Sequence, residues 1–335
     1  MTHVFQRALA GRRAALVAGA GCALSFTFPA RSQAWPSRPL HIIVPFPPGG
    51  SSDVLARTVA AELGKTLGRR VVIENVPGAG GSLGGERAAL AAPDGHTLFM
   101  GHVGTLAINP ALYPELRYEP LRSFTPVAWV ARVPNVLVVS AAVGARSVKD
   151  LVALAKSRPG QLAYGSGGNG SAAHTAMEYF KLQTGASLLH IPYRGTAPSV
   201  ADMLSGQVQV LFTGLPALLP HIKSGRMRPL AVSSTKRLPA LPEVPTLAES
   251  GVPGTRDFEA DQWYGLVAPA GTPAEIVATL NRHVNNALSL PEVRARLASE
   301  GAEATPATPK AFGELIAREI PRWARVVKAA RIRRD

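Results

Sequence analysis

Cysteine is almost absent from this sequence: among its 335 residues, only Cys22 is a cysteine. Cys22 lies in an N-terminal segment that we predict to be removed after synthesis. The remaining chain would therefore contain no disulfide, no thiol nucleophile and no cysteine ligand for a metal. Charge is also sparse. Charged residues make up 17% of the chain and hydrophobic residues 46%, a composition typical of a globular protein with a large buried core.

Acidic residues are missing from every position before Asp53, and the start of the chain has the form of an export signal. Arg7, Arg12 and Arg13 are followed by an apolar run at residues 14–28. This run is shorter than the roughly 20 residues of a membrane-spanning helix, and small residues suited to signal peptidase follow it at 32–34. We expect residues 1–34 to be a signal peptide that is cleaved after Ala34, which predicts a periplasmic protein. The adjacent arginines leave both Sec and twin-arginine export open.

The formal net charge is +14, but the basic residues are scattered and cluster only at residues 331–334. No basic stretch is interleaved with aromatic residues, so we do not expect nucleic acid as a partner. A basic balance is compatible with acidic ligands. No segment after residue 34 is apolar enough to cross a bilayer, so we expect the exported chain to be soluble.

Short apolar segments alternate with amphipathic ones along the chain. Strands are predicted at residues 40–44, 71–74, 97–101, 162–164, 188–191, 208–212, 229–233 and 263–268. Helices are predicted at residues 52–67, 82–92, 148–157, 172–184 and 196–205, and most of the chain after 272 is predicted to be helical. Repeated strand-helix units of this kind indicate an α/β protein with mainly parallel sheets flanked by helices.

These units are too many for one sheet, so the sequence predicts two α/β domains joined by two crossover strands. A break near Pro134 and a return near residues 259–262 divide the chain. Domain 1 then comprises residues 35–134 and 260–335, and domain 2 comprises residues 135–259. Ligands of open α/β sheets bind beyond the carboxyl ends of the strands, which places a ligand between the two domains.

A glycine-rich loop at residues 45–53 leaves the first strand and enters the first helix. Its glycines allow the backbone to approach a ligand closely, and Ser51 or Ser52 could cap the helix or donate a hydroxyl. The free N–H groups and the positive end of the helix dipole form a site suited to an anion. The same pattern also fits a tight turn with a capping serine and no ligand.

A second loop of the same kind, at residues 164–171, also follows a strand and opens a helix. Two such loops, one from each domain, could direct two helix N-termini at one ligand with one or two carboxylates. His174, in the first turn of the second helix, could donate to the ligand or only pack there. A third glycine-rich loop, at residues 77–82, would lie beside the first loop if their strands are neighbours.

Two motifs favour a secreted enzyme instead. Residues 165–170 fit the G-x-G-x-x-G pattern of an NAD(P)-dependent oxidoreductase, but no acidic residue follows the next strand where a ribose would need one. Residues 80–84 fit the G-x-S-x-G pattern of a serine hydrolase, but Ser82 is too far from the end of the preceding strand. His96 and His102 are not part of a metal-binding motif. We therefore predict no catalytic residue, no metal and no cofactor.

Several segments, in their order and spacing, match one family. They are Trp35-Pro36-Ser37-Arg38-Pro39, Val44-Pro45-Phe46 with Gly49-Gly50 and Asp53, Glu74-Asn75, Pro77-Gly78-Ala79-Gly80-Gly81, Pro93-Asp94-Gly95, Ile191-Pro192-Tyr193-Arg194-Gly195, Leu241-Pro242-Glu243-Val244-Pro245-Thr246 and Trp263-Tyr264-Gly265. In these segments the chain resembles the Bug-type (TctC-like) receptors, the periplasmic substrate-binding proteins of tripartite tricarboxylate transporters.

The resemblance implies a two-domain Venus-flytrap fold of the periplasmic-binding-protein type. It implies a small organic acid as ligand, a di- or tricarboxylate or an aromatic carboxylate, and membrane transporter subunits as partners. A signalling partner stays open as an alternative, and we expect a monomer. Backbone amides, hydroxyls and bridging water hold the carboxylate in that family, and water-bridged contacts can be nearly as favourable enthalpically as direct ones.

Two positions depart from the family pattern. Thr213 stands where many relatives have an acidic residue, which favours a plain carboxylate over an amino acid as ligand. Pro47-Pro48 stiffens the first loop and removes a donor. The predicted ligand-binding residues are Phe46, Pro48, Gly49, Gly50, Ser51, Ser52, Asp53, Ala79, Thr105, Ser166, Gly167, Asn169, Gly170, Ser171, His174 and Thr213.

Overall fold

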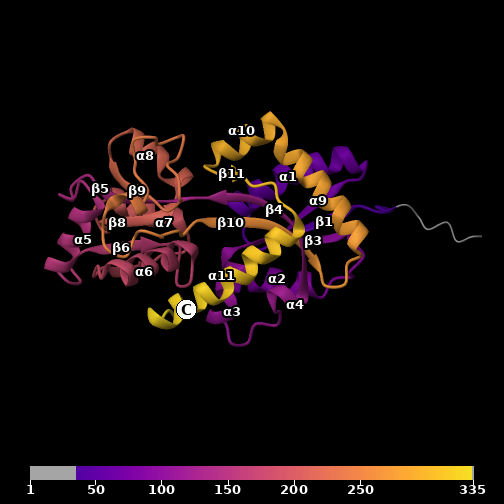
Figure 1. Cartoon of the computed structure of the whole chain (residues 1–335), viewed down its shortest axis with the longest axis horizontal. Helices are drawn as coiled ribbons and strands as arrows, with labels where there is room; N and C mark the ends of the chain where they lie inside the picture. Colours follow the sequence, from indigo (N-terminus) through magenta and orange to yellow (C-terminus); the bar gives the residue numbers. More distant parts are fainter. Residues whose placement is uncertain (1–34, 334–335) are drawn as a thin grey trace, which may run out of the picture. The chain divides into compact units, whose positions relative to one another are not determined.

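The computed structural model describes residues 35–333, which form two mixed β-sheets with helices packed around them (Figure 1). The predicted signal peptide, residues 1–34, lies outside the described residues. The predicted strands and helices are present with small shifts at their ends, and they form part of a larger set that runs from β1 to β11 and from α1 to α11.

The first sheet has six strands in the order β11-β4-β10-β3-β1-β2. Strand β1 pairs in parallel with β2 and β3, as expected for strand-helix units, whereas β10 pairs antiparallel with β3 and β4. The bounds are Leu40–Val44 for β1, Val71–Asn75 for β2, Thr97–His102 for β3, Phe124–Val133 for β4, Gln262–Pro269 for β10 and Glu303–Ala304 for β11.

The second sheet has five strands in the order β7-β6-β8-β5-β9. Strand β6 is parallel to β7 and β8, and β5 is antiparallel to β8 and β9. The bounds are Asn135–Ser140 for β5, Ala163–Ser166 for β6, Leu189–Pro192 for β7, Val210–Gly214 for β8 and Met227–Val232 for β9.

The sheets contain more antiparallel pairing than the predicted mainly parallel arrangement. The physical reason is the route of the chain between them. Strand β4 leads out of the first sheet and β10 leads back into it, and these two strands are direct neighbours, so they must run in opposite directions (Figure 1). The predicted strand-helix units keep their parallel pairing.

Helix boundaries follow local sequence signals closely. Helix α1 (Ser51–Leu67) buries Leu55, Val59 and Leu63, which lie on the predicted apolar face, and it ends at Gly68 in the left-handed region. Helix α5 (Val148–Ser157) begins with Ser147, whose hydroxyl accepts from the Asp150 N–H. The Ser147 hydroxyl therefore caps this helix.

The other helices complete the packing around each sheet. Near the first sheet lie α2 (Ser82–Ala89), α3 (Asn109–Leu112), α4 (Pro120–Ser123), α9 (Ala274–Ser289), α10 (Pro291–Ser299) and α11 (Pro309–Ala329). Near the second lie α6 (Ala172–Thr184), α7 (Thr196–Leu204) and α8 (Leu219–Lys223). Apolar contact continues between the groups, because Trp323 of α11 meets Tyr179 of α6 with ring centroids 6.2 Å apart.

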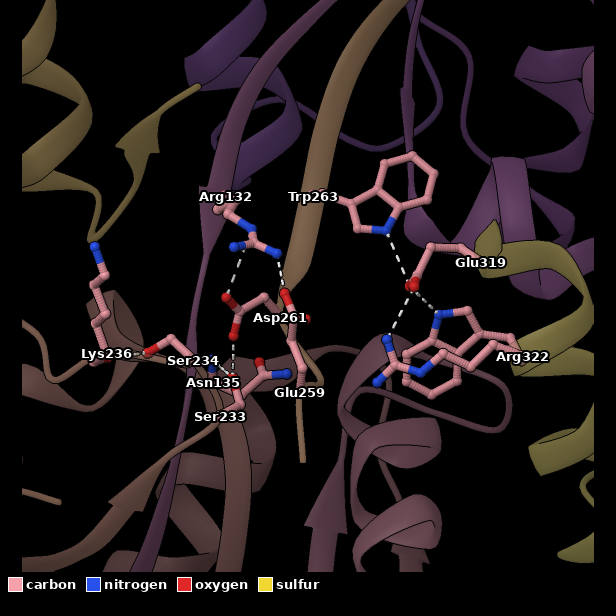
Figure 2. A network of polar contacts seen from close by, with 11 residues as sticks. Arg132, Asn135, Ser233, Ser234, Lys236, Glu259, Asp261, Trp263, Glu319 and Arg322 are labelled. Carbon is pink, nitrogen blue, oxygen red and sulfur yellow. Dashed lines mark hydrogen bonds and ion pairs between the residues drawn. The ribbon is translucent and has the colours of Figure 1, made fainter. Parts of the chain in front are cut away.

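Two buried polar clusters lie where the chain passes between the sheets (Figure 2). In the first, the Asp261 carboxylate accepts from the Ser233 hydroxyl, and Arg132 pairs with Glu259. The Arg132 Nε also lies 3.9 Å from Asp261 Oδ2. In the second cluster, the carboxylate of Glu319 on α11 faces three donors, which belong to Trp263, Trp323 and Arg322.

Candidate functional site

The first glycine-rich loop is held in shape by Asp53 and Asn75. The Gly49 N–H donates to Asp53 Oδ2 at 3.0 Å, and the Asn75 side chain donates to Asp53 Oδ1 at 3.0 Å and to the Phe46 oxygen at 2.9 Å. Gly49 has φ +86°, a conformation that side chains other than glycine rarely adopt. The loop at the end of β1 therefore has a fixed conformation of its own.

The charge of Asp53 is satisfied within the protein. Its carboxylate also accepts from Arg57 Nε at 2.9 Å, and the side chain is nearly inaccessible to solvent. Burial acts to raise the pKa of Asp53, but the hydrogen bonds from Arg57, Gly49 and Asn75 outweigh it, so the pKa is lowered. The carboxylate stays ionised and paired, which limits its repulsion of a nearby anion.

Neither Ser51 nor Ser52 caps α1, because Gly50 is the N-cap residue and no side chain bonds to the first turn. Ser52 is buried, and Ser51 hydrogen-bonds Tyr264 of β10. The Tyr264 hydroxyl also donates to the side chain of Gln262 at 3.0 Å. The N-terminus of α1 therefore has no side-chain cap, which leaves this helix end suited to an anion.

A π-helical turn at Gly104–Ile108 follows β3 and places Thr105 beneath the loop. A Cβ placed on Gly81 would lie 2.8 Å from Thr105 Cγ2 and 2.9 Å from Pro45 Cβ, so the third glycine-rich loop packs directly on the first. The predicted proximity of these two loops is confirmed. Only glycine fits at residue 81.

The buried ring of His102 packs beside this turn. Its ring meets Phe46 at 4.8 Å and Tyr264 at 5.8 Å between centroids, and its Nδ1 accepts from the Thr105 N–H at 3.2 Å. Burial lowers the pKa of His102 to about 3. The imidazole is therefore neutral and serves to hold the Thr105 turn.

The second loop, between β6 and α6, is built on Ser166 and Ser171. The Ser166 hydroxyl oxygen accepts from the Gly168 N–H at 3.1 Å, and the Ser171 hydroxyl accepts from the His174 N–H, which caps α6. The Gly170 N–H donates to Nδ1 of His174 at 2.9 Å. Like the first loop, it is a glycine-rich strand-to-helix connection with internal hydrogen bonds.

Three rings lie behind this loop. The imidazoles of His174 and His190 are stacked with centroids 3.8 Å apart, and His190 also stacks on Tyr164 at 4.8 Å. Burial, together with the nearby charge of Lys181, lowers the pKa of His174 to about 4. His174 is consequently neutral near pH 7, and because its Nδ1 accepts a hydrogen bond, its proton is on Nε2.

The predicted residues fall into two groups at the ends of strands. The first group lies in and around the first loop and comprises Phe46, Pro48, Gly49, Gly50, Ser51, Ser52, Asp53, Ala79 and Thr105. The second group forms the second loop and the start of α6 and comprises Ser166, Gly167, Asn169, Gly170, Ser171 and His174. Thr213 is buried in β8, opposite Val136 of β5. A Cβ placed on Gly170 would lie 2.1 Å from Leu112 Cδ2, so the second loop reaches α3 beside the first sheet.

Two cavities lie elsewhere in the described chain. One of about 320 Å³ is lined by Ala79, Ser82, Tyr113 and Arg117 and shares only Ala79 with the predicted set. Another, of about 390 Å³, is lined by Arg146, Pro229, Glu243 and Glu249 and shares none. The candidate site is therefore defined by the loops and their donors.

Three further residues support the loops without having been predicted: Asn75, Tyr264 and His190. Asn75 and Tyr264 were recognised only as parts of matching segments, and His190 only as part of a strand. Each contacts its loop from another strand of the same sheet, and the strand order is not readable from one sequence.

The geometry at Ser82 differs from that of a serine hydrolase. A 3₁₀ turn at Ala79–Gly81 separates Ser82 from β2, whereas a nucleophile elbow follows a strand directly. The Ser82 hydroxyl accepts from the Asn109 side chain at 3.0 Å and is buried. This serine holds α3 against α2.

Comparison with known proteins supports the assignment that the loops suggest. Residues 55–332 match the model of the tripartite tricarboxylate transporter family receptor. The chain belongs to this receptor family. It is 42% identical to the protein BugT of Bordetella pertussis over 301 residues, which cover 90% of this chain and 91% of BugT.

Solved structures of relatives show the same fold. A Rhodopseudomonas palustris protein solved with adipate is 39% identical, with a TM-score of 0.80, over 90% of this chain and all of that one. MatC from the same organism, solved with bound malate, is 36% identical, with a TM-score of 0.76, over 87% of this chain and 99% of MatC. The chain therefore has the two-domain α/β fold of the periplasmic binding proteins. Within residues 35–333, no helix is both long and apolar enough to cross a membrane.

Proposed function

We propose that this protein is an extracytoplasmic solute receptor that binds a small organic carboxylate between its two glycine-rich loops and delivers it to a membrane transporter. It acts in the periplasm as a monomer after removal of residues 1–34. The parts formed by residues 35–134 with 260–335, and by residues 135–259, move toward each other around the ligand. The receptor makes and breaks no bond.

The observation that carries the proposal is the matched construction of the two loops. Each follows a parallel strand and opens a helix, α1 or α6, whose N-terminus favours negative charge. The one carboxylate in the first loop, Asp53, is already paired with Arg57. Two relatives of the same fold were solved with dicarboxylates, adipate and malate.

Within this proposal, the ligand contacts come from both loops. Backbone N–H groups and hydroxyls at residues 46–53 hold one carboxylate together with Ala79 and Thr105. Residues 166–174 and Thr213 close over it from the other side. Thr213 is neutral, so nothing at that position selects for the amine of an amino acid, and a plain di- or tricarboxylate or an aromatic acid is the expected ligand class.

The proposal is tested by thermal-shift screening and calorimetry of the purified protein with adipate, malate, citrate, glutamate and benzoate. A ligand held at 100 times its Kd adds about 2.7 kcal/mol to the stability of the folded state, which raises Tm clearly. NAD(P) and a chromogenic ester serve as controls for the oxidoreductase and hydrolase alternatives. The absence of any carboxylate response would overturn the proposal, and a Tm shift with NAD(P) or ester turnover would then identify the alternative.

A matched pair of variants locates the site. Ser51→Ala removes a hydroxyl at the start of α1, and Ser289→Ala removes an exposed one at the end of α9. We expect the first to weaken carboxylate binding at least tenfold, because one hydrogen bond to a charged group contributes about 1.5–3 kcal/mol. The second should leave the affinity unchanged. Equal affinities for both variants would exclude the first loop as the site.

A further inference from the structure

His190 lies against the hydroxyl group of the second loop. Strands β6 and β7 are parallel neighbours in which Tyr164 lies opposite His190 and Ser166 opposite Pro192. The register brings His190 Nε2 to 2.7 Å from Ser166 Oγ. Ser166 is 1% exposed, so this contact is shielded from water.

Whether the Ser166 hydroxyl donates its proton to a ligand or to His190 depends on whether His190 Nε2 carries a hydrogen. A serine hydroxyl has one proton and two lone pairs. One lone pair of Ser166 Oγ receives the Gly168 N–H at 3.1 Å. If His190 Nε2 carries a hydrogen, it fills the second lone pair and leaves the hydroxyl proton for another acceptor. If Nε2 carries none, it takes the hydroxyl proton, and Ser166 presents a lone pair that repels an anion.

Two backbone donors of this loop are already used within it, which makes the orientation of Ser166 important. The Gly168 N–H is used by Ser166, and the Gly170 N–H is used by His174. Neither amide can turn to a ligand without breaking its bond. Ser166 Oγ is 3.2 Å from the Gly168 oxygen, an alternative acceptor for its proton until a stronger one arrives. A carboxylate is a stronger acceptor than a carbonyl oxygen.

The imidazole of His190 is fixed on two sides. His174 stacks on it at 3.8 Å with an interplanar angle of 11°, and Tyr164 stacks at 4.8 Å with an angle of 23°. Tyr164 in turn donates to Glu178 at 2.6 Å, and Glu178 pairs with Lys181. The ring has little freedom to swing away from Ser166 Oγ.

We propose that His190 is a positioning residue of the carboxylate site, which holds the Ser166 hydroxyl as a hydrogen-bond donor toward the bound anion. The assignment rests on the proposed function, because it needs a carboxylate at the second loop. His190 acts through Ser166 and does not touch the ligand. A glutamine at 190 can place an amide N–H where Nε2 lies, whereas a leucine offers no donor.

Calorimetric titration with adipate and malate tests the assignment on the wild type, Ser166→Ala, His190→Leu, His190→Gln and the double variant Ser166→Ala/His190→Leu. We expect Ser166→Ala and His190→Leu each to raise Kd at least tenfold and the double variant to be no weaker than either. His190→Gln should stay within about threefold of the wild type. His283→Gln, on α9, is the control and should bind as the wild type does.

The outcomes separate the two proposals. A wild type that binds none of the acids in the screening panel overturns the proposed function and the assignment with it. A wild type that binds, with His190→Leu unchanged, overturns only the assignment. A double variant whose increase in Kd equals the product of the two single increases also overturns the assignment, since His190 would then act independently of Ser166.

Discussion

The side chain of Asn135 donates to the backbone oxygen of Ala260 at 2.7 Å and so joins the two chain segments that pass between the sheets. Its amide oxygen accepts from Gln262 Nε2 at 3.0 Å. Val133 and Gln262 are paired in the first sheet, while Asn135 and Ala260 are both bonded to Ser233 beside the second. Only Pro134 and Asp261 lie between these two sets of bonds.

Asn135→Ala should destabilise the protein strongly. The substitution leaves the Ala260 oxygen and the Gln262 amide without their buried partner, and each unsatisfied group costs about 1–3 kcal/mol. We expect a loss of at least about 2 kcal/mol in the free energy of unfolding, measured by urea denaturation. Asn286→Ala, at an exposed position of α9, should change it by less than about 0.5 kcal/mol. Equal midpoints for the two variants would show that the Asn135 bonds contribute little.

Asp261 should make stability fall as pH rises through the weakly acid range. Burial raises the pKa of Asp261 from 3.8 to about 6, although the Ser233 hydrogen bond and the Arg132 charge oppose this. The folded state therefore binds the proton more tightly than the unfolded state does, so the free energy of unfolding decreases between about pH 4 and pH 6. Asp261→Asn removes this dependence. Relative to the wild type, it should gain about 2–3 kcal/mol between pH 4 and pH 7.

Asp53→Asn is a control for that measurement, because its stability relative to the wild type should change with pH in the opposite direction. The pKa of Asp53 is lowered in the folded protein, so its contribution is present above 3.8 and is lost as pH falls. The Asp53→Asn variant should therefore lose stability relative to the wild type as pH rises, whereas Asp261→Asn gains it. Parallel slopes for the two variants would contradict the assignment of Asp261.

Two carboxylates on α11 should differ sharply in their effect on stability. Glu319 is buried and accepts from Trp323 at 2.9 Å and from Arg322 at 2.9 Å. Glu319→Ala leaves a mostly buried guanidinium unpaired, a change that costs about 3–5 kcal/mol for buried pairs. Glu314 is exposed and lies 3.8 Å from Lys310, so Glu314→Ala should cost under about 1 kcal/mol. Guanidinium melts of both variants check this ranking, which similar midpoints would refute.

Gly170 and Gly160 provide a matched test of the contact between the second loop and α3. Both have φ +72°, so alanine at either position carries the left-handed penalty of about 1–2 kcal/mol. A Cβ at 170 would also overlap Leu112, whereas nothing lies within 4 Å of one at 160. We expect Gly170→Ala to be the less stable by about 1 kcal/mol or more. Adding Leu112→Ala should reduce the extra loss at 170, and an unchanged loss would mean that the loop moves away freely.

Local signals account for what the sequence predicted well. The Ser147 cap, the apolar spacing of α1 and the Gly185 end of α6 each act within a few residues, so helix limits at 148–157 and 172–184 agree with the structure. Strand β4 was not predicted, because its residues alternate weakly and its burial comes from β10, a strand more than a hundred residues later. The π-helical turn that places Thr105 gave no recognisable pattern.

In the candidate site, too, the sequence predicts the features that are local in the chain and misses those that depend on tertiary contacts. The two loops could be found from their glycines and the helices behind them, since those features are contiguous. His190, Tyr264 and Asn75 lie on other strands, and their contacts with the loops depend on a sheet order that no local signal specifies. Asp261 carries no sequence signal of its own, because its burial arises only where the two crossover segments meet.

Both loops are pre-organised by their own hydrogen bonds, Gly49 to Asp53 in one and Gly168 to Ser166 in the other. A bound acid therefore has little backbone to order, and the conformational entropy lost on binding is correspondingly small. If the receptor closes as proposed, the chain must also be fixed at Pro134 and Asp261, the residues between the two sets of bonds described above, which involves only a few torsion angles. Ordering of the loops would then subtract little from the affinity, and the main entropic cost left is the lost translational and rotational freedom of the acid itself.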